Sequence, residues 1–278
     1  MRVSVVQMNP GHDKAANIAQ ATRLIDSAIS SDHADIIGLP EVWTCLGGDR
    51  AAKFDQAESL PPPGSNEPGG PAYEFLRGVA REKRVHVHGG SIGEKAGEKL
   101  FNTTVVFDPE GLEIGRYRKI HLFDITAPDG TGYRESATFG AGSQVVTCEA
   151  NGIRIGLAIC YDLRFGELFL ALRRAGAEVI FLPAAFTRET GRDHWEVLLR
   201  ARAIEAQSWF AAPACWGTHI DGSGEQRWTY GHSLLCDPWG HVIARASDGI
   251  GWATARIDPK LTARVRRDMP VLEHRRLV

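Results

Sequence analysis

Three side chains capable of acid–base and nucleophilic chemistry stand just after short apolar runs of the sequence. Glu41 follows residues 34–39, Lys119 follows residues 112–117, and Cys160 ends the run that begins at residue 153. A thiol has an ordinary pKa of about 8.5, so at neutral pH it needs a base or a positive neighbour to become a nucleophile. A carboxylate can take the proton, and an ammonium group can stabilise the oxyanion formed on a carbonyl or nitrile carbon. The three residue types together suggest catalysis by a thiol.

Each of these residues also has a purely structural interpretation. Most free cysteines are small buried hydrophobic residues. A single glutamate is usually solvated, and Lys119 follows two arginines in a segment that resembles a charged surface. Cys160 stands where an apolar strand gives way to an amphipathic segment, and the N–H groups at a helix start favour a thiolate. The residues taken one at a time leave both interpretations open.

The first part of the chain predicts how Glu41 is positioned. Residues 3–8 and 34–39 are strand-like, and residues 13–30 between them carry apolar positions at helical spacing. A strand–helix–strand unit implies parallel strands. Glu41 is therefore expected at the carboxyl end of a strand, where functional groups of open α/β sheets tend to lie.

The second half repeats this pattern. Residues 34–43 read ADIIGLPEVW and residues 177–186 read AEVIFLPAAF. Both segments have an acidic residue at the second position, then an apolar run, a Leu-Pro step and a final aromatic residue. Two such units predict two sheets packed face to face with helices outside. The remaining predicted helices are 73–83, 167–174 and 195–205, and the remaining strands are 85–92, 101–108, 112–117, 144–149, 154–160, 177–182, 210–215, 233–237 and 242–246. Residues 59–71 and 124–143 are expected to be polar, glycine-rich or proline-rich excursions.

Composition excludes several classes of function. The formal net charge of -2 gives no basic footprint for nucleic acid. No apolar stretch approaches the length of a membrane span, and a strand begins almost at once without a signal-peptide pattern, which favours the cytoplasm. The odd and scattered set of five cysteines argues against a disulfide framework. His86 and His88 could share one strand face, but no third ligand with suitable spacing accompanies them.

Three motifs in the same order and spacing give a specific resemblance. They are LPE ending at Glu41, YRKIHLFD around Lys119, and CYDLRFGE beginning at Cys160. Together they resemble the nitrilase, or carbon–nitrogen hydrolase, superfamily over essentially the whole chain. The resemblance implies a single domain spanning residues 1–278 with the four-layer αββα sandwich of this α/β family, usually paired across subunits. It also implies that neither a metal nor an organic cofactor is required.

The resemblance also implies roles for individual residues. Glu41 matches the general base, Lys119 the group that stabilises the oxyanion, and Cys160 the nucleophile. Glu135, in YRES, matches a second glutamate that orients the lysine and the substrate. The backbone N–H of Tyr161 is expected to share the oxyanion with Lys119.

The residues after Cys160 and two later segments point to a branch of the family. True nitrilases tend to carry Cys-Trp-Glu, whereas this chain has CYDLRF; HWEVLLRARAIE (194–205) and YGHS (230–233) are most similar to the deaminated glutathione amidases, with omega-amidases as a sister branch. Substrates of both branches carry carboxylates, and Arg164 matches the position that binds one. The further residues that match substrate-contacting positions are His121, Phe186 and Thr190.

Two positions depart from the family pattern. Gly166 stands where proline is usual, which loosens the turn after Arg164. Glu41 is followed by Val42-Trp43 where relatives more often have Asn or Ala and then Phe, so Trp43 is expected to reshape the acyl pocket.

The sequence therefore predicts a cytoplasmic, homodimeric or larger homo-oligomeric enzyme that converts a small carboxylate-bearing amide to an acid and ammonia through a Cys160 thioester. Within the enzyme class, nitrile and N-carbamoyl hydrolysis are weaker alternatives. A thiol enzyme with His121 or His232 as base, and a catalytically silent binding protein on the same fold, also remain open.

Overall fold

Two sheets form the centre of the computed structural model, which describes residues 1–127 and 130–277. The first sheet has the order β18-β1-β2-β3-β5-β4, with β6 and β9 also paired to β5, and the second has the order β10-β11-β12-β13-β16-β17. The strands of the first sheet are β1 (Arg2–Gln7), β2 (Ile36–Gly38), β3 (His86–His88), β4 (Ile92–Ala96), β5 (Lys99–Phe107), β6 (Glu113–Arg118), β9 (Phe139–Gly140) and β18 (Gly251–Arg256). Those of the second are β10 (Thr147–Ala150), β11 (Ile153–Leu157), β12 (Val179–Phe181), β13 (Trp209–Ala212), β16 (Leu234–Cys236) and β17 (Val242–Arg245).

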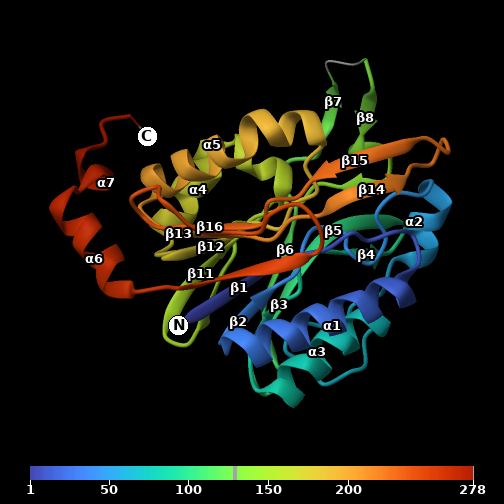
Figure 1. Ribbon diagram of the computed structural model, residues 1–278, viewed down its shortest axis with the longest axis horizontal. Helices are drawn as coiled ribbons and strands as arrows, with labels where there is room; N and C mark the ends of the chain where they lie inside the picture. The colour runs from blue at the N-terminus through green and yellow to red at the C-terminus, as the bar shows by residue number, and fades with distance from the viewer. Residues whose placement is uncertain (128–129, 278) are drawn as a thin grey trace.

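Helices cover the outer faces of both sheets (Figure 1). The blue and teal helices α1 (Lys14–Asp32) and α3 (Pro71–Lys83) lie outside the first sheet, and the yellow helices α4 (Gly166–Arg174) and α5 (Arg188–Ala206) lie outside the second. Between the sheets, side chains such as Val5 and Ile36 share one buried cluster with Ile155 and Leu157. The predicted four-layer αββα sandwich is thus confirmed.

The internal repeat is confirmed by strand pairing. Strands β1, β2 and β3 are parallel, as are β11, β12 and β13. In each half an antiparallel strand flanks the first of these, β18 beside β1 and β10 beside β11. The strands before the repeated Leu-Pro steps, β2 and β12, therefore end at equivalent places in the two sheets.

The first helix shows why the local sequence folds as predicted. Asp13 caps α1 by accepting the backbone N–H groups of Ala15 and Ala16, and His33 ends it in the left-handed conformation. Leu24 and Ile25 belong to its buried face, which packs toward the first sheet. The expected helix over residues 13–30 is confirmed, with an end two residues later.

Several elements differ from the sequence-based expectation. Residues 85–92 are not one strand, because Gly89-Gly90 separates β3 from β4 and Gly90 has a φ of 62°. Helix α5 begins at Arg188, seven residues before the predicted start, because Thr187 caps it by accepting the N–H of Thr190. Part of the excursion 124–143 forms the hairpin of β7 (Asp124–Thr126) and β8 (Gly132–Arg134) and the 3₁₀ turn η1 (Glu135–Ala137); residues 128 and 129 of that excursion lie outside the described ranges.

Other elements were not predicted. They are α2 (Arg50–Gln56), the hairpin of β14 (Trp216–Ile220) and β15 (Gln226–Tyr230), the edge strand β18, and the C-terminal helices α6 (Pro259–Asp268) and α7 (Val271–His274). The β14–β15 hairpin and the β7–β8 hairpin both extend from the right-hand part of the molecule in Figure 1. No helix in the described part of the chain is both long and apolar enough to cross a membrane.

Candidate active site

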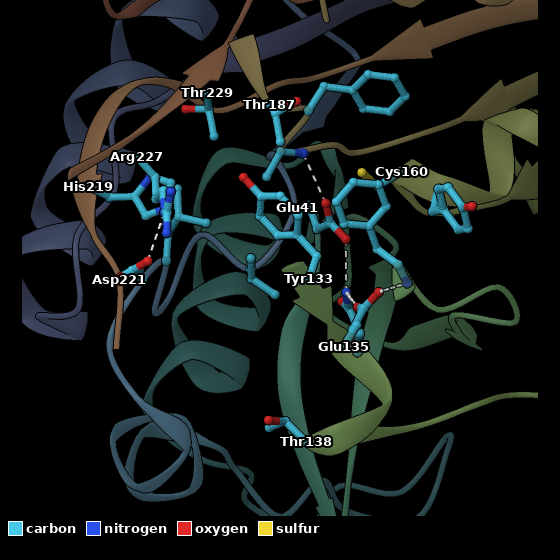
Figure 2. Close-up of a pocket in the computed structure, with 18 of the residues that line it drawn as sticks. Glu41, Tyr133, Glu135, Thr138, Cys160, Thr187, His219, Asp221, Arg227 and Thr229 are labelled. Carbon is cyan, nitrogen blue, oxygen red and sulfur yellow. Dashed lines mark hydrogen bonds and ion pairs between the residues drawn. The ribbon is translucent and has the colours of Figure 1, made fainter. Parts of the chain in front are cut away.

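A cavity of about 340 Å³ is lined by residues that follow strands of both sheets and by residues of the β7–β8 and β14–β15 hairpins. Glu41 lies just after β2, Lys119 just after β6, and Cys160 at the start of the 3₁₀ turn η2 (Cys160–Arg164) after β11. All three line the cavity together with Glu135. The structure therefore brings together the four residues that the motifs singled out (Figure 2).

The Glu41 carboxylate is buried and held at both oxygens. The backbone N–H of Ala185 donates to Oε2 at 2.9 Å, and Asn102 Nδ2 donates to Oε1 at 2.9 Å. Ala185 belongs to the repeated unit of the second sheet, so the carboxylate links the two halves of the fold. A third contact to Glu41 comes from Lys119.

The Lys119 ammonium group lies between two carboxylates. Its Nζ donates to Glu41 Oε1 at 2.9 Å and to Glu135 at 2.8 Å to Oε2 and 3.1 Å to Oε1, and the side chain is 2% exposed. Burial alone would lower the Lys119 pKa, but the charges of Glu135 and Glu41 outweigh it and hold the pKa well above its ordinary value. Lys119 therefore keeps its charge inside the protein.

Glu135 is fixed by backbone and side-chain donors. The N–H of Phe123 donates to Oε2 at 2.7 Å, and Asn102 Nδ2 approaches Oε1 at 3.2 Å. Asn102, on β5, thus contacts both glutamates that flank Lys119. These contacts hold the carboxylates of Glu41 and Glu135 in place on either side of the Lys119 ammonium group.

Cys160 adopts an unusual backbone conformation. Its φ is 47°, in the left-handed region that a residue with a side chain rarely occupies, and its N–H donates to Pro183 O at 2.9 Å. Such backbone strain clusters at functional sites, where the surrounding structure holds it. The conformation turns the chain sharply from β11 into η2 at the reactive sulfur.

The electrostatic environment of Cys160 differs from the sequence-based expectation of a thiolate at a helix start. Burial raises the pKa of the thiol well above its ordinary value, and the charge of Glu41 raises it further, while Lys119 lowers it. Helix α4 begins at Gly166, so no α-helix N-terminus lies at the sulfur. At neutral pH the resting side chain is a thiol beside a base.

Asp162 supports the turn that carries Cys160. This fully buried carboxylate accepts the Tyr117 hydroxyl at 2.7 Å, the Ile159 N–H at 2.8 Å and the His121 N–H at 3.1 Å, and it contacts His121 Nδ1 at 2.7 Å. It links the residue before Cys160 to the segment that carries Lys119. Asp162 stands in the CYD motif, but no sequence pattern predicts these partners, nor the contacts of Asn102 and Ala185 with Glu41.

Four of the residues proposed to contact substrate line the cavity: Tyr161, Arg164, Phe186 and Thr190. The Arg164 guanidinium lies 5.6 Å from the Phe186 ring centre and 5.9 Å from that of Tyr161. Its terminal nitrogens lie 3.3 and 3.4 Å from His194 Nδ1. Thr190 Oγ1 is 2.8 Å from Thr187 Oγ1.

Two other expected substrate contacts lie outside the cavity lining. Trp43 is fully buried, donates from Nε1 to Gly89 O at 2.8 Å and packs against Phe75, because its apolar ring fills the space between the first sheet and α3. His121 stacks on Phe165 with ring centres 3.8 Å apart, while its Nδ1 contacts Asp162. The expected reshaping of the pocket by Trp43 would therefore have to act through the protein interior.

Neither His121 nor His232, the two histidines considered as a base, lines the cavity. His232, the other histidine considered as a base, stacks on Tyr230 and lies 3.7 Å from Asp248, outside the cavity lining. His86 and His88 are buried in β3, and His88 stacks on Phe181. Across residues 1–127 and 130–277, no group of three or more His, Cys, Asp or Glu side chains is placed to hold a metal ion.

The chain is similar to several known proteins. The profile of the family described as carbon-nitrogen hydrolase matches residues 2–267. The chain is 41% identical to a protein named deaminated glutathione amidase from Synechocystis, covering 98% of this chain and 97% of that protein. It is 35% identical to human omega-amidase NIT2, covering 99% and 95%. The crystal structure of Saccharomyces cerevisiae Nit3, a member of branch 10 of the nitrilase superfamily, superposes with a TM-score of 0.86 at 29% identity, covering 100% of this chain and 97% of that one.

Proposed function

Because the chain belongs to the carbon-nitrogen hydrolase family, we propose that it hydrolyses the C–N bond of a small, carboxylate-bearing amide through a thioester on Cys160. The observation that carries this proposal is the buried Lys119 ammonium, held between Glu41 and Glu135 in the cavity that also contains the Cys160 thiol. One cation and two carboxylates beside a thiol supply the base, the acid and the oxyanion partner of an acyl transfer.

The first half-reaction forms the acyl-enzyme. Glu41 accepts the Cys160 proton as Sγ attacks the amide carbon, so the carbonyl π bond becomes an oxyanion that Lys119 Nζ and the Tyr161 N–H stabilise. The raised pKa of the thiol makes this transfer to Glu41 part of the attack rather than a preceding equilibrium. Protonated Glu41 then gives its proton to the leaving nitrogen, the C–N bond breaks, and the acyl group remains on sulfur.

The second half-reaction releases the acid. Glu41 accepts a proton from a water molecule as the water oxygen attacks the thioester carbon, and the same donors stabilise the second oxyanion. The C–S bond then breaks, and the sulfur regains its proton from Glu41. Glu135 acts as a positioning residue, because its two oxygens hold the Lys119 ammonium group.

Arg164 is proposed to bind a carboxylate on the acyl side of the substrate. Its guanidinium faces the cavity between two aromatic rings, where it can offer paired N–H donors. Relatives carry the names deaminated glutathione amidase and omega-amidase, which suggests these amides as first substrates. A primary omega-amide would release ammonia, whereas deaminated glutathione has secondary amides and would release an amine.

The test is hydrolysis of both amides by the wild type and by Cys160→Ala. We expect turnover of at least one amide and a loss of at least about 10³-fold in kcat for the variant, as for other nucleophile deletions. Mass spectrometry after an acid quench should show the acyl group on Cys160. Turnover that survives in Cys160→Ala would overturn the mechanism.

The alternatives give different results in the same assays. A binding protein would leave every amide intact, and a nitrilase or N-carbamoyl hydrolase would act on nitriles or carbamoyl compounds instead. A histidine base would make His121→Gln or His232→Gln as damaging as Glu41→Gln.

We also propose a homodimer or larger homo-oligomer and a cytoplasmic location, as the sequence resemblance implies. Exposed apolar side chains on α5 and the adjacent turn, Val197, Ile204 and Trp239, support self-association. Light scattering during gel filtration would measure the mass, and a monomer at micromolar concentration would overturn the first expectation. Fractionation of the source cells would test the second.

A further inference from the structure

The cavity extends well beyond the reactive thiol, toward the hairpin of β14 and β15. Figure 2 shows His219, Arg227 and Asp221 on the far side of the cavity from Cys160, with Glu41 and Tyr133 between them in this view. Lys53, on α2, lines the same part of the cavity. We call Lys53, His219 and Arg227 the distal group.

The position of Glu41 decides what this region can hold. In the proposed reaction Glu41 gives its proton to the leaving nitrogen, so the substituent on that nitrogen must extend past Glu41. Arg164 lies on η2, four residues after the nucleophile, and serves the acyl side. In the view of Figure 2, His219 and Arg227 lie beyond Glu41 as seen from Cys160, which in the proposed reaction is the amine side of the scissile bond.

The charges of the cavity favour an anion there. Apart from Glu41, Lys119 and Glu135, the charged residues in the described lining are the four cations Lys53, Arg134, Arg164 and Arg227 and the single carboxylate Asp221. This surplus of positive charge is larger than one substrate carboxylate bound at Arg164 would neutralise. A second anionic group on the substrate would meet complementary charge.

Asp221 offsets one of these cations, because it is paired with Arg227 within the hairpin. It accepts the Ser223 N–H at 2.8 Å, the Ser223 hydroxyl at 2.6 Å, the Glu225 N–H at 3.1 Å and Arg227 Nε at 2.8 Å. These contacts hold its pKa well below the ordinary value against the opposing effect of burial. Arg227 also lies 3.1 Å from Glu225, so it is fixed in place between two carboxylates, and the unpaired positive charge of the distal group comes from Lys53.

Lys53 and His219 retain bonding capacity. Within residues 1–127 and 130–277, Lys53 forms no ion pair, and His219 Nδ1 is buried without a hydrogen-bond partner. Burial lowers the pKa of His219, so its ring is neutral near pH 7 and can donate one hydrogen bond. A buried polar atom without a partner is costly in a folded protein unless a ligand satisfies it.

The backbone fixes these two side chains relative to each other. Gly48 N–H donates to Ile220 O at 3.0 Å, which ties the segment before α2 to β14. At Gly47, with a φ of 84°, a Cβ atom would lie 2.2 Å from the same oxygen, so this close approach requires glycine. The distal group is therefore built from two segments held in register.

We propose that the distal group is a subsite for a carboxylate on the amine side of the scissile amide, so that the substrate is a secondary amide with an anionic group at each end. Lys53 supplies the pairing charge, His219 supplies a hydrogen bond, and Arg227, held by Asp221 and Glu225, forms one wall of the subsite. This inference rests on the proposed amidase function and selects, within it, amides of amino acids or short peptides over primary amides.

The test compares two matched substrates, deaminated glutathione and the same molecule with its C-terminal carboxylate converted to a carboxamide. We expect wild type to favour the carboxylate by about 10-fold or more in kcat/KM, the value of one charge-assisted hydrogen bond. Lys53→Met should reduce this preference at least about 5-fold, and Lys53→Glu should reduce it further or reverse it. Lys260→Met, an exposed lysine on α6, is the matched control and should retain the wild-type preference.

The outcomes separate the two proposals. Cleavage of both substrates with equal efficiency, or a preference that survives Lys53→Glu, would overturn the distal subsite and leave the amidase function standing. Failure of wild type to cleave any amide would overturn the proposed function and this inference with it. The wild-type comparison needs no variant, so the test holds even if a substitution reduces stability.

Discussion

Gly38 and Phe181 occupy equivalent places in the two halves of the fold and pack against each other between the sheets. Gly38 ends β2, Phe181 ends β12, and a Cβ atom built on Gly38 would lie 2.9 Å from the Phe181 ring. The two repeats therefore differ at this position for a packing reason. A large ring on one strand requires the absence of a side chain on the other.

Replacing Gly38 with alanine should destabilise the protein. The added methyl group meets the Phe181 ring and, at 3.4 Å, the side chain of Pro213, so the core must shift. We expect a loss of about 1–3 kcal/mol in the free energy of unfolding, as for other overpacked cores. Urea denaturation would measure it, with Gly78→Ala on α3, where the Cβ meets nothing within 4 Å, as the control. Equal effects at the two sites would contradict this explanation.

The neighbour of Phe181 on the other sheet gives a pH-dependent prediction. His88 stacks on Phe181 at 4.6 Å between ring centres, and complete burial lowers its pKa to about 3. Between pH 6.5 and 3 the unfolded chain binds a proton at this residue that the folded protein does not, so His88 makes stability fall as pH falls. Acidification from pH 6.5 to 5 should therefore lower the free energy of unfolding by about 2 kcal/mol through His88.

The measurement is urea denaturation of wild type and His88→Asn at both pH values. The variant is expected to be less stable at pH 6.5 but to lose about 2 kcal/mol less on acidification. Parallel pH profiles for the two proteins would show that His88 carries no such linkage. His33→Asn, at the exposed end of α1, would control for a histidine outside the core.

Sequence patterns predicted the arrangement of the core because the relevant signals are local. The apolar runs and the repeated Leu-Pro steps specify parallel strands, and their ends bring Glu41 and Cys160 to one edge. The hairpin of β14 and β15 was missed, although its burial alternates with a period of two, because polar residues such as His219 and Arg227 interrupt the apolar pattern. His219 and Arg227 of the proposed distal subsite lie in that missed segment, and Lys53 lies on α2, which was also not predicted.

The partners of the catalytic groups could not be predicted for a different reason. Ala185 contacts Glu41 across 144 residues of sequence, and Asp162 contacts Tyr117 across 45. No local pattern encodes such pairs, since they depend on how the two sheets are placed face to face. Trp43 shows the same limit: the sequence places it two residues after Glu41, but its ring is buried in the core, so the expected effect on the pocket would act through the interior.

Lys119→Ala should remove most turnover. The ammonium group is proposed to stabilise both oxyanions, and loss of one such donor costs about 10²–10³-fold in kcat. Because Glu41 and Glu135 would then face each other without a cation, Lys119→Ala/Glu135→Gln provides a second variant with less repulsion. Circular dichroism would establish folding before kcat is measured. Near-wild-type turnover in either variant would remove the assigned role.

Glu41→Gln should have opposite effects on the ionisation of Cys160 and on turnover. The charge of Glu41 raises the pKa of Cys160, so the neutral amide should lower that pKa while turnover is lost. The pH dependence of iodoacetamide labelling, read at Cys160 by mass spectrometry, measures the pKa. Glu110→Gln, at an exposed turn, should leave it at the wild-type value. A labelling pKa that rises or stays constant in Glu41→Gln would contradict the proposed electrostatics.

Asp162 is predicted to position the nucleophile rather than to react. Its carboxylate accepts N–H groups from Ile159 and His121 and the Tyr117 hydroxyl, so Asp162→Asn would point an amide N–H₂ group at donors. We expect a loss of about 1–3 kcal/mol in the free energy of unfolding for Asp162→Asn. Tyr117→Phe should cost about 1 kcal/mol, because it removes one donor to Asp162 and the long 3.3 Å contact from the Ile120 N–H.

The kinetic signature distinguishes positioning from stability alone. Displacement of the turn at Cys160 should make kcat lower in Tyr117→Phe than in wild type and lower still in Asp162→Asn. KM should change little, because the proposed contact of Arg164 with the acyl side is not altered. The measurements are kcat and KM on folded protein at a temperature well below each melting transition, with Cys160 labelling rates as a second readout. Wild-type kcat and labelling in folded Asp162→Asn would show that the carboxylate stabilises the fold without positioning the sulfur.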